Sequence, residues 1–102
     1  MATPTEQQQR ALSYLRSLEL MVDDLPEIAD EWDELSDGEC ESWSHDWDNE
    51  MAKLTFLGEY VAQGVLADDD ERRYSEVVQK LRDAAPLIRQ THLRSPQISS
   101  TP

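Results

Sequence analysis

The sequence predicts an all-α fold, a small antiparallel bundle of four helices of which one is short. Apolar residues recur at steps of three and four along most of the chain, which is the period of a helix with one buried face. An N-cap residue followed three positions later by Glu occurs before each apolar stripe, a pattern typical of a helix start. The chain has 3 glycines and few β-branched residues, which argues against a strand-rich fold.

The first two helices are expected at residues 4–22 and 25–35. Thr3 and Asp24 are their predicted N-caps, since an oxygen-bearing side chain there accepts a free backbone N–H. Pro4 suits the first helical position, where a missing N–H is tolerated. The two apolar stripes consist of Ala11, Leu15, Leu18 and Val22, and of Leu25, Ile28, Trp32 and Leu35. Two separate amphipathic helices are therefore predicted.

The third and fourth helices are expected at residues 37–65 and 69–93, with Ser36 and Asp68 as N-caps. Pro86 lies inside the fourth and is expected to kink it, since proline removes a backbone donor and crowds the preceding turn. The apolar stripes consist of Trp43, Trp47, Met51, Leu54, Leu57, Val61 and Val65, and of Tyr74, Val77, Val78, Leu81, Ala84, Ala85 and Ile88.

These last two helices are expected to form a long antiparallel α-hairpin, because the connection between them is short. A turn near residue 67 would place Trp47 opposite Ile88, and Asp46 opposite Arg89 as an ion pair. Residues 1–94 are predicted to form a single helical domain. Residues 95–102 have no apolar periodicity and are expected to form a flexible tail.

Charge is distributed very unevenly along the chain. The formal net charge is −13. Between Arg16 and Lys53 there is no Lys or Arg, but there are fourteen carboxylates: Glu19, Asp23, Asp24, Glu27, Asp30, Glu31, Asp33, Glu34, Asp37, Glu39, Glu41, Asp46, Asp48 and Glu50. A surface this one-sided repels itself, and it attracts cations or a basic partner. Direct binding to nucleic acid or to an anionic membrane is not expected of such a molecule.

The composition indicates a cytoplasmic, non-enzymatic protein. A single cysteine, Cys40, excludes an internal disulfide framework and suits a reducing compartment. No apolar run approaches the length of a membrane span or of a signal-peptide core. With only His45 and His92 available, and no glycine-rich phosphate loop, the sequence contains no plausible catalytic constellation.

The favoured interpretation is a binding protein of the inhibitor, DNA-mimic or adaptor type that docks a basic partner protein through its carboxylates. Three of the carboxylates are explained by predicted helix starts: Asp24, Glu27 and Glu39. The candidate partner-binding residues are those left without such a reason: Asp30, Asp33, Glu34, Asp37, Glu41 and Asp48.

Two alternatives stay open at this point. One is a divalent-metal site for Ca²⁺, Mg²⁺ or Zn²⁺, formed by Asp46, Glu50 and His92 between two helices. Glu50 stands out because it falls on the apolar side of its predicted helix, where an unpaired carboxylate is costly. The other alternative is an acidic homo-oligomeric scaffold, in which the acidic segment of one copy contacts the more basic fourth helix of the next.

Overall fold

A computed structural model describes residues 5–96, and within that range the chain is helical with no strands. The elements are α1 (Glu6–Glu31), the short 3-10 helix η1 (Trp32–Glu34), α2 (Asp37–Ala62), α3 (Asp68–Asp83) and α4 (Ala85–Gln90). The all-α prediction is confirmed. The predicted N-cap Thr3, the adjoining Pro4 and residues 97–102 of the predicted tail lie outside the described residues.

Helix α1 is one continuous helix where the sequence predicted two. Its N-cap is Thr5, whose hydroxyl accepts from the backbone N–H of Gln8 while the Gln8 side chain accepts from the N–H of Thr5. The predicted helix start at Asp24 is wrong, because Pro26 is accommodated inside the helix. The stripe that starts at Leu18 continues without a break through Val22, Leu25 and Ala29, all buried. Burial of this stripe outweighs the one backbone hydrogen bond that proline removes.

Helix α2 begins where the sequence predicted and ends slightly earlier. The Ser36 hydroxyl accepts from the backbone N–H of Glu39 at 3.2 Å, which confirms the predicted N-cap. At the other end, Gly64 has φ +72°, and the N–H groups of Gly64 and Val65 donate to the carbonyls of Val61 and Tyr60. This is the Schellman arrangement, in which a residue in the left-handed region stops the helix.

The predicted fourth helix is two helices in the structure. Helix α3 stops at Asp83, the chain turns at Ala84, and α4 begins at Ala85 with Pro86 in its first turn. Proline is well suited to that position, because its missing N–H would have no intrahelical partner there. The predicted N-cap of α3 is one residue too late, since Ala67 holds the extended backbone of the cap and Asp68 is already helical.

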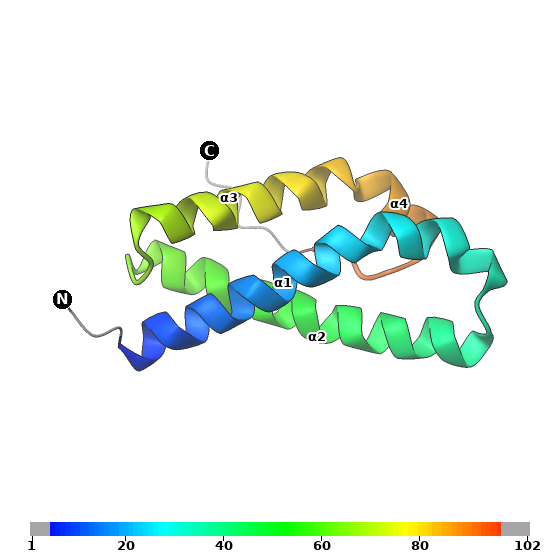
Figure 1. Cartoon of the computed structure of the whole chain (residues 1–102), viewed down its shortest axis with the longest axis horizontal. Helices are drawn as coiled ribbons and strands as arrows, with labels where there is room; N and C mark the ends of the chain where they lie inside the picture. The colour runs from blue at the N-terminus through cyan, green and yellow to red at the C-terminus, as the bar shows by residue number, and fades with distance from the viewer. Residues whose placement is uncertain (1–4, 97–102) are drawn as a thin grey trace.

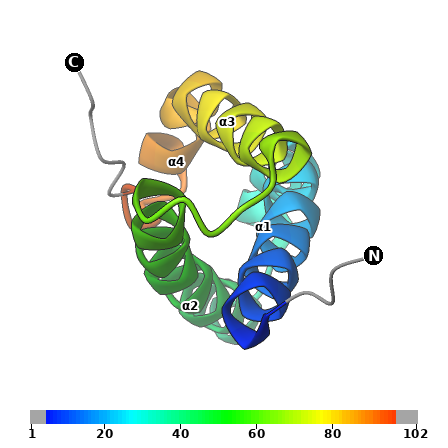
Figure 2. The ribbon, with the colours of Figure 1, turned by 90° about the vertical axis from the view of Figure 1, so that its left-hand side faces the viewer.

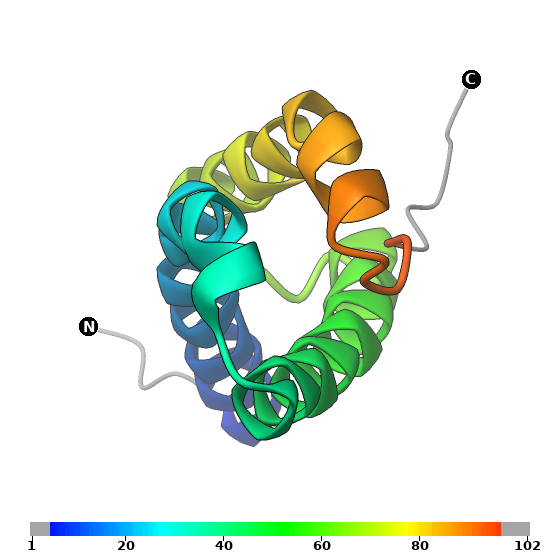
Figure 3. The same cartoon turned by 90° about the vertical axis from the view of Figure 1, so that its right-hand side faces the viewer.

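Helix α1 lies at the centre of the packing and runs along both α2 and α3 (Figure 1). Seen along the long axis, α4 lies between α3 and α2 (Figures 2 and 3), and it packs against α1 and α3. The long α-hairpin is not confirmed. Helices α2 and α3 approach each other near their connection, where a Cβ on Gly58 would lie 3.2 Å from the Tyr74 hydroxyl oxygen. The predicted Asp46–Arg89 ion pair does not form among residues 5–96.

The core lies between α1, α2 and the two C-terminal helices. Its largest fully buried side chain is Trp47, and it also contains Leu15, Leu18, Leu25, Leu54, Leu57, Val77, Leu81 and Ile88. Trp43 stacks on Trp47 with ring centroids 5.7 Å apart, and both Trp43 and Trp32 are partly buried against this core. The tryptophans are therefore packing residues, and the carboxylates around them form the exposed surface.

Candidate functional site

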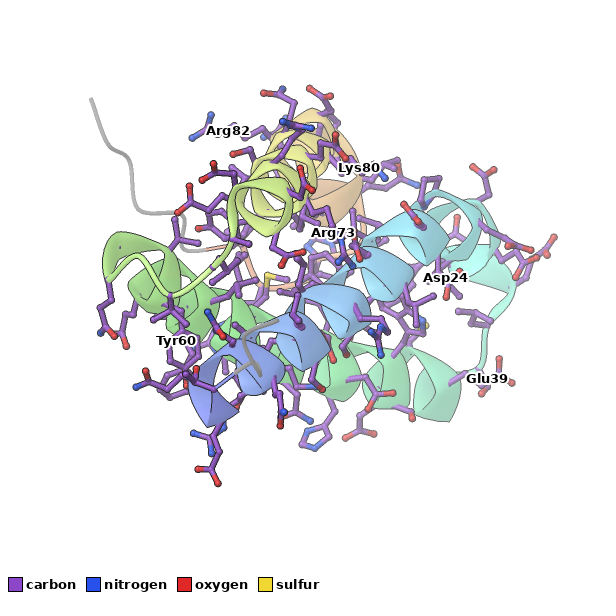
Figure 4. All side chains as sticks on the ribbon, turned by 60° about the vertical axis from the view of Figure 1, so that its left-hand side comes forward. Asp24, Glu39, Tyr60, Arg73, Lys80 and Arg82 are labelled. Carbon is purple, nitrogen blue, oxygen red and sulfur yellow. The ribbon has the colours of Figure 1, made fainter. Side chains whose placement is uncertain are left out.

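Eleven of the fourteen carboxylates between Arg16 and Lys53 are exposed and form no ion pair within residues 5–96, and we call this set the acidic end. They lie on the C-terminal part of α1, on η1 and on the first half of α2. The residues are Asp24, Glu27, Asp30, Glu31, Asp33, Glu34, Asp37, Glu39, Glu41, Asp46 and Asp48. In Figure 4, Asp24 and Glu39 lie toward the same end of the molecule, away from Tyr60.

All six predicted partner-binding residues belong to the acidic end and are exposed: Asp30, Asp33, Glu34, Asp37, Glu41 and Asp48. The sequence prediction wrongly assigned Asp24 and Glu27 to a helix start. Because α1 is continuous, these two residues lie inside the helix and have no capping role. Glu39 does lie in the first turn of α2 and its backbone N–H donates to the Ser36 hydroxyl, but within residues 5–96 its carboxylate makes no hydrogen bond back to Ser36. The acidic end, with its eleven carboxylates, is therefore larger than the set of six partner-binding residues that the sequence predicted.

Part of the acidic end carries charge of the unfavourable sign for the dipole of the helix on which it lies. The last turn of α1 carries Asp30 and Glu31 and no basic residue, although the C-terminal end of a helix is its negative pole. By contrast, α3 has four acidic residues in its first turn and Lys80 and Arg82 in its last, which is the stabilising arrangement. The charges of α3 can be explained by helix stability, whereas those at the end of α1 cannot.

The other three of the fourteen carboxylates between Arg16 and Lys53 are paired. Glu19 accepts from the guanidinium of Arg73, which also contacts Asp70 at 3.3 Å. Asp23 accepts from Lys80 Nζ at 2.9 Å. These two pairs join α1 to α3 (Figure 4), and the hydrogen bonds raise the pKa of Arg73 and of Lys80. The third carboxylate, Glu50, is paired in a different way.

Glu50, on the apolar side of its helix, is buried, and it joins α2 to α1. Its Oε1 accepts from the Ser17 hydroxyl at 2.7 Å and from Lys53 Nζ at 2.9 Å. Its Oε2 is buried and has no hydrogen-bond partner among the described residues. Lys53 follows Glu50 by three positions, a spacing that brings side chains together on a helix, so this pair was visible in the sequence. The Ser17 contact depends on how α1 and α2 pack.

The predicted metal site of Asp46, Glu50 and His92 does not assemble. Within residues 5–96 no group of three or more His, Cys, Asp or Glu side chains is placed to hold a metal ion. His92 is exposed and has φ +58°, so it does not lie between the helices as that site requires. Its N–H and that of Leu93 donate to the carbonyls of Arg89 and Ile88. His92 therefore ends α4 in a second Schellman arrangement.

Comparisons with protein-family models, with curated proteins and with solved structures found no match to this chain. None of the helices in the described range is long and apolar enough to cross a membrane. The function is therefore inferred from the charge and geometry of the chain itself.

Proposed function

We propose that this chain is a non-enzymatic binding protein whose acidic end docks onto a basic surface of a partner protein. The observation that carries the proposal is the set of eleven exposed carboxylates that form no ion pair within residues 5–96. Six of them form the predicted contact set: Asp30, Asp33, Glu34, Asp37, Glu41 and Asp48.

The cost of these charges supports the proposal. Asp30 and Glu31 destabilise the end of α1 through the helix dipole, and the neighbouring carboxylates repel one another. A cationic partner would relieve both effects on binding. Exposed charges of one sign also accelerate association with a surface of the opposite sign, with a strong dependence on salt. An inhibitor, a DNA mimic or an adaptor would each use such a surface.

The proposal is tested with two variants of equal net charge. The first replaces the six contact residues by their amides, as Asp30→Asn, Asp33→Asn, Glu34→Gln, Asp37→Asn, Glu41→Gln and Asp48→Asn. The matched control neutralises six exposed acids elsewhere, as Glu6→Gln, Glu59→Gln, Asp68→Asn, Asp69→Asn, Glu76→Gln and Asp83→Asn. Each protein is immobilised and used to capture partners from a native lysate at low salt, followed by elution in a salt gradient.

We expect a basic protein that is retained by the original chain and by the control, and lost from the contact variant. With the purified partner, the association rate constant should fall at least about tenfold in the contact variant, because steering by clustered charge is worth roughly 10 to 1,000-fold. A partner that both variants retain equally, or equally lose, would show that net charge alone is responsible and that the acidic end is not the docking surface.

A further inference from the structure

A groove between α1 and α2 borders the acidic end and contains the buried Glu50. It has a volume of about 370 Å³ and is lined by Ser17, Leu20, Met21, Asp24, Asp46, Asn49, Glu50 and Lys53. We propose that this groove receives an arginine side chain of the basic partner. This inference rests on the proposed function and adds to it a specific anchoring pocket.

The first argument comes from Glu50. Its side chain is only 10% exposed, and its Oε1 is fully used by Ser17 and Lys53. Its Oε2 is buried without a hydrogen-bond partner among the described residues. A buried carboxylate oxygen without a donor is uncommon in folded proteins. Glu50 also lines the groove, and a turn of its carboxylate toward the groove would bring the covered Oε2 to a donor there.

The second argument comes from charge. Besides Glu50, the groove is lined by the carboxylates of Asp24 and Asp46, and both are exposed and unpaired in residues 5–96. Lys53 is the one cation of the lining, and it is already bonded to Glu50 Oε1. Three carboxylates against one ammonium leave the groove net negative. Its occupant is therefore a cation.

The third argument selects arginine among cationic side chains. Leu20, which is 66% exposed, and Met21 supply apolar side chains to the same groove lining as the carboxylates. A guanidinium is planar and weakly hydrated, so its face packs on apolar groups while its five donors reach several acceptors. The lysine ammonium is strongly hydrated and lacks this planar fork. An exposed leucine next to carboxylates therefore suits arginine better than lysine.

The test uses the full chain labelled with ¹⁵N and with ¹³C-methyl methionine. Blocked tetra-arginine and tetra-lysine peptides of equal charge are titrated into it and followed by NMR. We expect tetra-arginine to bind several-fold more tightly than tetra-lysine, and to shift the Asn49 side-chain amide and the Met21 methyl most. Glu50→Gln should abolish this preference for arginine.

Because Glu50→Gln could disturb the packing of α1 on α2, a second variant changes only exposed residues. The double variant Asp24→Asn with Asp46→Asn should lower the affinity for tetra-arginine about tenfold, which is the effect of losing one strong contact. The control, Asp37→Asn with Glu41→Gln, removes the same charge from the acidic end outside the groove and should have a smaller effect.

The outcomes separate this inference from the proposed function. Equal weakening by the two double variants, or shifts confined to η1 and the first turn of α2, would overturn the groove while leaving the acidic end as a docking surface. No preference between the two peptides would also overturn it. Failure of both peptides to bind at low salt would overturn the groove and count against the proposed function as well.

Discussion

The indole Nε1–H of Trp47 donates a 2.7 Å hydrogen bond to the backbone carbonyl of Arg94. This bond joins the middle of α2 to the segment that follows α4. Trp47 is fully buried, and the neighbouring Leu93 is 7% exposed. The chain after α4 is therefore held against α2 by one polar contact and by apolar packing.

Trp47→Phe should lower the free energy of unfolding by about 1–3 kcal/mol, from the lost hydrogen bond and the smaller side chain. Urea unfolding followed by far-UV circular dichroism measures this change. Trp43→Phe is the control. Trp43 belongs to the same aromatic stack but is only partly buried, so its variant should lose less. Equal losses would mean that the bond to Arg94 contributes little.

Charge changes at the ends of α1 and α3 should have opposite effects on stability. Glu31→Gln removes a negative charge from the C-terminal turn of α1 and should raise the free energy of unfolding by about 0.3–1 kcal/mol at low ionic strength. Asp68→Asn removes one from the first turn of α3 and should lower it by a similar amount. Thermal unfolding in dilute buffer compares the two. Changes of the same sign would show that net charge, rather than the helix dipole, dominates.

The two Schellman arrangements provide a matched pair of substitutions. Gly64 and His92 both have positive φ, +72° and +58° respectively, but only glycine adopts that region without a steric cost. His92→Gly should therefore stabilise the fold, and Gly64→Ala should destabilise it, each by about 1 kcal/mol. Chemical denaturation measures both. A loss of stability in His92→Gly would indicate that the imidazole makes a contact that outweighs the backbone strain.

Stability should fall in alkaline solution partly because of Tyr74. Burial raises the pKa of Tyr74 above its ordinary value of 10.0, so the unfolded chain releases the phenol proton more readily than the folded one. The contribution is complete below pH 10 and is lost as the pH rises further. Tyr74→Phe should make this decline shallower. The Tyr74 chain and the Tyr74→Phe variant are compared in a Lys80→Arg background. This removes the lysine, whose pKa is raised by Asp23 and which titrates in the same alkaline range.

Salt should stabilise this protein through screening of the acidic end. The melting temperature should rise with sodium chloride, and the six-amide contact variant should respond less than the control variant. Magnesium chloride at matched ionic strength distinguishes screening from specific binding. A much larger rise with magnesium would show that the ion binds the folded state directly, since such a ligand adds stability by linkage.

The sequence alone determined the local features of this protein. Its helical periodicity, the N-cap at Ser36 and the one-sided charge between Arg16 and Lys53 all depend on residues close together in the chain. The place of Glu50 on the apolar side of a helix followed from the same local spacing. The six predicted contact residues are exposed for the same reason, because each falls outside an apolar stripe.

Only the tertiary structure decided where helices stop and which residues meet. Pro26 and Pro86 have the same local chemistry, yet α1 continues through the first while the chain breaks next to the second. The difference is packing: the buried stripe of α1 runs unbroken past Pro26, whereas after Ala84 the chain changes direction so that α4 packs against α1 as well as α3. The same packing brings Ser17 to Glu50 and turns His92 outward. Such contacts join distant segments, and local periodicity carries no information about them.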